Sequence, residues 1–123
     1  MVAMAAGCAR KNAGFFQPGT EDYTQQISVF KKMGAEILAG VMQSADFTNL
    51  WKQCLQQGFK PKIGSIGQAL TFAETLEAIG PSAYGLTSEL AWHRDYPYKS
   101  SFTGQTCEEL AAAFEADTGK QYS

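Results

Sequence analysis

The sequence predicts an α/β fold, a three-layer sandwich in which helices flank a mainly parallel sheet. Segments with helical periodicity alternate with short strand-like runs, in the order helix, strand, helix, strand, helix, strand, helix. The chain has 123 residues, of which 45 % are apolar and 18 % are charged, which is ordinary composition for a globular domain. We therefore expect a single domain spanning 1–123.

The first part of the chain contains two expected helices and the clearest strand. An Ala-rich stretch is expected to form a short helix over 2–11. Asp22 stands three residues before Gln25, which approximates a capping box, and the helix that follows is expected to end at Gly34. The run Glu36–Met42 is too short and too continuously apolar for an amphipathic helix, so it predicts a strand buried on both faces.

The next helix has the most regular pattern in the chain. Its apolar residues occupy positions i, i+3, i+4, i+7 and i+8, and they are Phe47, Leu50, Trp51, Cys54 and Leu55. A second strand is expected over about 62–66. Right-handed crossovers between such parallel strands would place helices on both faces of the sheet.

The last part of the chain contains two expected helices separated by a strand. Thr71 and Glu74 predict one capping box, and Thr106 and Glu109 predict another. The apolar stripes of these two helices are Phe72, Leu76 and Ile79, and Leu110 and Phe114. The strand Tyr84–Trp92 between them contains Ser, Thr and Glu, so we expect it to lie near a sheet edge.

Composition excludes several classes of function. The net charge is −2 and no basic cluster is present, which argues against nucleic acid as a partner. No stretch has the apolar length needed to span a membrane. Three cysteines cannot all pair within the chain, and with a single histidine and no CxxC motif a zinc site is not expected. No metal or other cofactor is expected. The N-terminus lacks the basic start and apolar stretch of a signal peptide.

The strand ends are where a ligand site is expected. In an open parallel sheet, ligands bind outside the carboxyl ends of the strands. Three such ends follow the predicted strands, at 42–45, 67–70 and 89–93. Helix starts beside these ends would offer backbone N–H groups to an anionic group.

Nothing in the sequence argues for catalysis, so we expect a protein that is not an enzyme. His93 is the only histidine, and no Ser or Cys stands at a spacing that would specify a triad. The glycines of 64–67 fit no phosphate-binding fingerprint. A small hydrolase built around His93 remains an alternative, as does a stand-alone flavodoxin-like interaction module.

Three blocks of the chain are similar to one family. They are "GFFQPGTEDYTQQISVFKKMGAEILAGVM", "DFTNLWKQCLQQGFKPKIGSIGQAL" and "KSSFTGQTCEELAAAFEADTGKQY". Together they resemble the type I periplasmic solute-binding proteins, which are the receptor subunits of ABC importers related to the branched-chain amino acid binding proteins. The resemblance covers residues 14–123.

The resemblance implies a flavodoxin/Rossmann-like half of a periplasmic binding protein whose parent binds a small polar molecule, expected to be an amino acid or an amide. The expected ligand-binding residues are Gln43, Ser44, Gln68, Ala69, Glu89 and Trp92. The chain departs from the family's pattern at three places: Gln43-Ser44-Ala45 replaces an apolar-proline loop, Ala73 replaces a frequent proline, and Ala91-Trp92 replaces a pair of tryptophans.

The resemblance further implies that the chain is part of the second lobe, shortened between Asn12 and Phe15 where the family has a strand. The parent would be periplasmic. Without that strand, one edge of the Glu36–Met42 strand would present unpaired N–H and C=O groups. We therefore expect a homodimer, or a domain-swapped pair, that restores the sheet across this edge.

Overall fold

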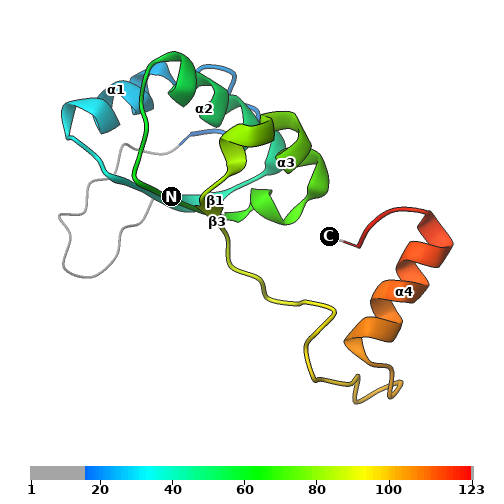
Figure 1. The fold of residues 1–123 in the computed structure, drawn as a ribbon. Helices are drawn as coiled ribbons and strands as arrows, with labels where there is room; N and C mark the ends of the chain where they lie inside the picture. The colour runs from blue at the N-terminus through cyan, green and yellow to red at the C-terminus, as the bar shows by residue number, and fades with distance from the viewer. Residues whose placement is uncertain (1–15, 123) are drawn as a thin grey trace. The chain divides into compact units, whose positions relative to one another are not determined.

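The computed structural model describes residues 16–122, so the helix expected over 2–11 and the shortening expected near Asn12 lie outside the described residues. The chain divides into two compact units, with the boundary between Glu89 and Leu90. The two units, called here the first and the second unit, are described separately (Figure 1).

A three-stranded parallel sheet forms the centre of the first unit. Its strands are β1 (Ile37–Met42), β2 (Ile63–Gln68) and β3 (Leu86–Thr87), and their order in the sheet is β1-β2-β3. β1 and β2 pair along their whole length, with Ile37 opposite Ile63 and Met42 opposite Gln68. The predicted α/β class with a parallel sheet is confirmed.

Three helices pack on this sheet: α1 (Thr24–Lys32), α2 (Ser44–Gln56) and α3 (Ala73–Ile79). Figure 1 shows all three on the same side of the sheet. The strands follow one another in chain order, and right-handed crossovers between such strands place successive helices on one face. The Glu36–Met42 strand is therefore not buried on both faces as predicted. On the face away from these helices, Val41 is 55 % exposed and Ile63 is 50 % exposed.

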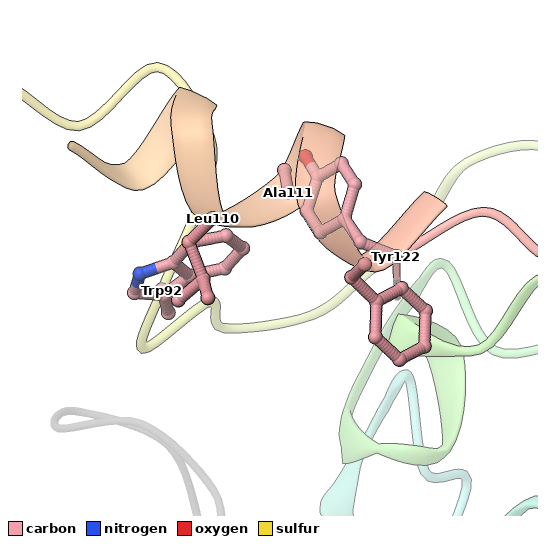
Figure 2. A pocket seen from close by; sticks show the side chains of 5 residues that line it. Trp92, Leu110, Ala111 and Tyr122 are labelled. Carbon is pink, nitrogen blue, oxygen red and sulfur yellow. The ribbon is translucent and has the colours of Figure 1, made fainter. Parts of the chain in front are cut away.

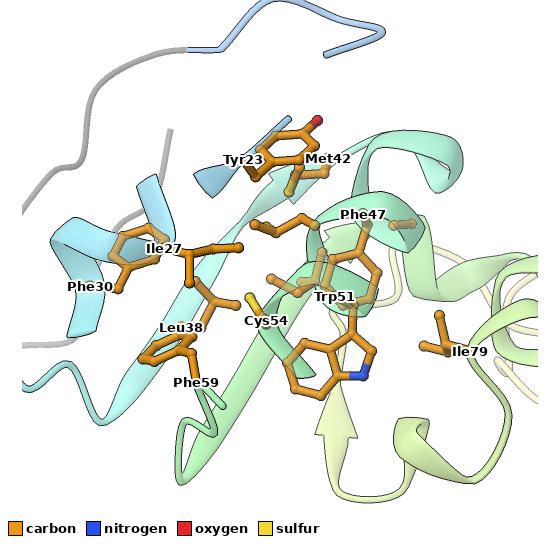
Figure 3. Close-up of a cluster of buried hydrophobic side chains, with 13 residues drawn as sticks. Tyr23, Ile27, Phe30, Leu38, Met42, Phe47, Trp51, Cys54, Phe59 and Ile79 are labelled. Atoms are coloured by element: carbon orange, nitrogen blue, oxygen red, sulfur yellow. The ribbon is translucent and has the colours of Figure 1, made fainter. Parts of the chain in front are cut away.

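The hydrophobic core lies between these helices and the sheet (Figure 3). The predicted apolar stripe of α2 supplies its centre, since Phe47, Leu50, Trp51 and Cys54 are all buried, while Leu55 is not. Leu38, Met42 and Ile66 enter the core from the strands. Burial raises the pKa of the Cys54 thiol to about 12, so this thiol packs as a small apolar group.

Two polar side chains of α2 hold the segment that precedes α1. The Asp46 carboxylate is buried and accepts hydrogen bonds from Gly19 N at 2.8 Å and from the Tyr23 hydroxyl at 3.3 Å. Two turns further along the helix, Gln53 Oε1 accepts a hydrogen bond from Tyr23 N at 2.8 Å. Burial, followed by the negative charge of Asp46, raises the pKa of Tyr23 to about 12. The start of α1 is thereby tied to α2.

Two of the predicted capping boxes are wrong. Asp22 accepts a hydrogen bond from Thr24 N at 2.8 Å, but α1 has no side-chain cap. The N-cap of α3 is Phe72, again without a side-chain hydrogen bond. The Thr71 hydroxyl donates to the Gln68 carbonyl at 2.6 Å and so closes the short 3₁₀ turn η1 (Ala69–Thr71), which the sequence pattern did not indicate.

The third strand and the third helix also differ from prediction. Only Leu86 and Thr87 of the expected strand Tyr84–Trp92 pair with β2. A second 3₁₀ turn, η2 (Gly80–Ala83), connects α3 to this strand. In α3, Ile79 is buried, but the other stripe residues Phe72 and Leu76 are exposed and Thr75 is buried in their place.

The second unit is organised around α4 (Cys107–Thr118). Its predicted capping box is confirmed, because Thr106 Oγ1 accepts from Glu109 N at 3.1 Å and the Glu109 carboxylate accepts from Thr106 N at 2.8 Å. Arg94 ties the preceding segment to the helix, donating to Glu108 at 2.6 Å and to Glu115 at 3.2 Å. Of the apolar α4 residues, Ala111 is buried, whereas the predicted stripe residues Leu110 and Phe114 are about half exposed.

Replacing Asp46 should loosen the attachment of α1 to α2. We expect Asp46→Ala to lower the free energy of unfolding by about 1–3 kcal/mol, because it leaves Gly19 N and the buried Tyr23 hydroxyl without their acceptor. Urea unfolding followed by circular dichroism measures this loss. Asp117→Ala, which removes an exposed carboxylate from α4, is the matched control and should shift the midpoint little. Equal midpoints for the two variants would contradict this account.

Candidate functional site

The carboxyl ends of β1 and β2 lie side by side. The two strands are parallel and Met42 pairs with Gln68, so Gln43 and Ser44 leave the sheet next to Ala69. This arrangement brings together four of the six predicted ligand-binding residues. It is the sheet edge at which open parallel sheets bind ligands.

At the end of β1, the chain turns directly into α2. Gln43 is exposed and extended, with φ −74° and ψ 158°, and its carbonyl accepts a hydrogen bond from Phe47 N at 2.9 Å. Ser44 is the first residue of α2 and is half-buried. The first N–H groups of a helix have no partner within the helix, so this end of α2 can offer donors to a bound group.

At the end of β2, Gln68 has an unusual backbone conformation. Its φ is 65° and its ψ is −59°, and it is the one non-glycine residue with positive φ in the part of the chain that the structure describes. Such a conformation costs about 1–3 kcal/mol and persists where the surroundings impose it. The Gln68 side chain is exposed, whereas the neighbouring Ala69 is fully buried in the core. A solute could therefore contact the Gln68 amide, and would meet only the backbone of Ala69.

Glu89 lies against the end of β2. A Cβ atom added to Gly67 would overlap the Glu89 carboxylate, so the carboxylate occupies the space that a side chain at position 67 would need. Glu89 is itself exposed. The structure thus brings a fifth predicted residue to the same end of the sheet.

A polar cavity of about 320 Å³ opens between the starts of α2 and α3. It is lined by Ser44, Ala45, Thr48, Asn49, Glu74 and Thr75. The lining contains a carboxylate, an amide and three hydroxyl groups, but no basic side chain. Thr75 is buried, and its Oγ1 has no hydrogen-bond partner within the described part of the chain.

Sequence reasoning missed four lining residues of this cavity: Thr48, Asn49, Glu74 and Thr75. A usable signal was present, because two predicted helices begin at the same sheet edge and their first turns must face each other. The expected capping role of Glu74 obscured it. The side chain that was assigned to the cap instead lines the cavity.

Trp92, the sixth predicted residue, belongs to the second unit. There it lines an apolar pocket of about 400 Å³ with Leu110, Ala111, Phe114 and Tyr122 (Figure 2). Its ring meets the Tyr122 ring edge-on, at a centroid distance of 5.3 Å. Its grouping with the other five residues stays a prediction.

His93 is surrounded by groups that do not form a triad. Its Nδ1 accepts a hydrogen bond from Asp95 N at 3.3 Å, and its ring contacts those of Tyr96 and Tyr122. Among residues 16–122, no three His, Cys, Asp or Glu side chains are grouped so that they could hold a metal ion. Within the same residues, no helix is long and apolar enough to cross a membrane.

Comparison with known proteins identifies the family. A model of the periplasmic binding protein family matches residues 2–123. The chain therefore belongs to the periplasmic binding protein family, whose modules bind small solutes. No curated protein and no solved structure matched the chain.

The strain at Gln68 can be measured directly. We expect Gln68→Gly to raise the free energy of unfolding by about 1 kcal/mol, because glycine adopts positive φ without the penalty that other residues meet. Gln43→Gly is the matched control: Gln43 is extended, so glycine there should destabilise through its greater freedom in the unfolded chain. Thermal unfolding of both variants tests the difference. A Gln68→Gly protein less stable than the parent would rule out strain at this residue.

Proposed function

We propose that this chain forms one wall of the solute-binding cleft of an ABC importer receptor and is not an enzyme. The observation that carries the proposal is the gathering of polar groups at one end of a parallel sheet: Gln43, Ser44, Gln68 and Glu89. Membership of the periplasmic binding protein family supports it. The parent protein would work in the periplasm.

The proposed ligand is an amino acid or an amide. The end of the sheet offers the amide groups of Gln43 and Gln68, both of which can donate and accept hydrogen bonds. Glu74 and Glu89 supply carboxylates that could accept from an ammonium or amide nitrogen.

Weak, localised binding is the expected behaviour of a single wall. A ligand site normally buries roughly 70–90 % of its ligand, which requires two opposing walls. We therefore expect neutral amino acids and short aliphatic amides to bind with dissociation constants of about 1 mM or weaker. Amide chemical shifts of the ¹⁵N-labelled chain, followed during titration, measure this. The shifts should move at Gln43, Ser44 and Gln68.

Two variants separate this binding from non-specific effects. Ser44→Ala should reduce the chemical-shift changes caused by any of these amino acids or amides that binds. Tyr84→Ala changes an exposed residue just before β3, away from the carboxyl ends of the strands, and should leave them unchanged. Shift changes centred on Tyr84, or micromolar binding by a monomer, would contradict a one-wall site.

We further propose that two chains pair through the outer edge of the Glu36–Met42 strand. Within the described residues, β1 pairs with β2 on one side, and no strand pairs with its other edge. Unpaired N–H and C=O groups on an apolar strand favour the addition of a second strand. Pairing would extend the sheet across both chains.

A charge at Val41 tests this edge. We expect the chain to sediment as a dimer at tens of micromolar, and Val41→Lys to sediment as a monomer, because lysine on an edge strand opposes pairing. Ile63→Lys is the matched control, since Ile63 lies on the same sheet face but on the central strand β2. Loss of the dimer in both variants would indicate association through the sheet face. An unmodified chain that sediments as a monomer at tens of micromolar would contradict the proposal.

A further inference from the structure

A loop in the second unit exposes an aromatic ring almost completely. Phe102 is 97 % exposed, and Tyr98, four residues earlier, is 68 % exposed. Fully exposed phenylalanine is uncommon on a surface that makes no contacts, and aromatic side chains are enriched at the centres of protein interfaces.

The loop that carries Phe102 is held firmly by its own hydrogen bonds. Ser100 N donates to the Gln105 carbonyl, and Gly104 N donates to the Ser100 carbonyl, both at 2.8 Å. The Ser100 hydroxyl accepts from Phe102 N at 3.2 Å and from Thr103 N at 3.1 Å. Phe102 is thus presented on an ordered turn, so little backbone entropy is lost when its ring is buried.

The base of this loop is fixed to the start of α4. Lys99 and Thr106 form an antiparallel bridge, and Thr106 is also the N-cap of the helix. The Cys107 thiol lies 3.7 Å from the Tyr98 carbonyl as a hydrogen-bond donor. The loop and α4 therefore form one structural element, and the position of Phe102 relative to α4 is set.

The same unit contains an unfilled apolar pocket. This pocket, of about 400 Å³, is formed by Trp92, Leu110, Ala111, Phe114 and Tyr122, and Figure 2 shows the rings of Trp92 and Tyr122 beside α4. The planes of the Trp92 and Tyr122 rings meet at 84°, and the two rings in contact form adjacent walls of the pocket. The volume is ample for a phenyl ring, and the lining offers apolar contact on several sides.

We propose that Phe102 of one copy inserts into this apolar pocket of a second copy. The chain presents an exposed aromatic side chain and an open apolar pocket on one ordered unit. Insertion of the ring would remove the apolar surface of both from water. The rest of the loop can take part, because Tyr98 stands at its base with an exposed ring. Insertion in both directions would give a closed dimer, and insertion in one direction would give a chain of copies.

Charge favours the approach of the two surfaces. α4 carries four carboxylates, Glu108, Glu109, Glu115 and Asp117, and no basic residue. Arg94 pairs with two of them, so the helix keeps a negative surface. Lys99 is the only charged residue in the segment 98–106 that carries Phe102. A positively charged loop and a negatively charged helix attract each other, which raises the association rate and disfavours wrong orientations.

This contact is separate from the solute-binding wall and from the β1 edge, both of which belong to the first unit. The test therefore uses Val41→Lys as the parent, so that pairing through the strand edge does not contribute, and it extends to millimolar concentration, above the tens of micromolar at which this variant is expected to be a monomer. Sedimentation velocity over a concentration series measures the association constant. Circular dichroism on each variant establishes that it is folded.

We expect Phe102→Ser and Leu110→Glu each to lower the association constant by about tenfold or more, because one removes the inserted ring and the other places a charge in the pocket. Ser101→Ala, at an exposed loop residue beside Phe102, should leave the constant unchanged. Association of the Phe102→Ser chain at the parent's strength would overturn the proposal.

Mixing the two variants identifies the occupant of the pocket. Phe102→Ser retains the pocket and Leu110→Glu retains the ring, so an equimolar mixture should form a mixed dimer at concentrations where each variant alone stays largely monomeric. A mixture that stays monomeric would show that Phe102 does not fill the pocket of a second copy. The proposal fails equally if the parent is monomeric at millimolar concentration.

Discussion

The packing of α2 against β1 and β2 is the interaction on which the rest of the first unit depends. Phe47, Leu50, Trp51 and Cys54 bury one face of the helix against strand residues such as Leu38 and Ile66. Burial of a large apolar side chain stabilises the folded state by about 1.5–3 kcal/mol, so this face supplies several times the contribution of any single hydrogen bond in the unit. It also sets where the first turn of α2 meets the sheet.

The candidate site follows from that placement. Because α2 starts one residue after Gln43, the end of β1 is carried by the most deeply packed helix of the unit. Asp46 and Gln53, on the same helix, hold the segment before α1 in place. The end of β2 is fixed differently: pairing with β1 holds Gln68 on one side and the buried Ala69 holds it on the other, which sustains its positive φ.

Local patterns predicted structure well where the relevant contacts lie within one helix. The stripe of α2 and the capping box of Thr106 and Glu109 each depend on residues three or four positions apart, and both are present. The same motif failed at Thr71, because α3 begins two residues later, at Ala73, with Phe72 as its N-cap. A motif of this kind specifies a possible bond, and it forms only where the helix begins directly after the Ser or Thr.

The candidate site likewise contains residues that the sequence predicted and residues that it did not. Gln43, Ser44 and Gln68 could be named from sequence, because the ends of parallel strands share one edge of a sheet. Glu74 and Thr75 were missed: the shared sheet edge indicates that their helix starts near α2, but the packing of α2 against α3 decides which of their side chains line the cavity. By itself, the sequence determined the class of fold, the apolar stripe of α2 and the end of β1, all of which follow from periodicity along the chain. Only the tertiary structure decided which face of the sheet the helices cover and how far β3 pairs. Those outcomes depend on strand order and on contacts between residues distant in sequence.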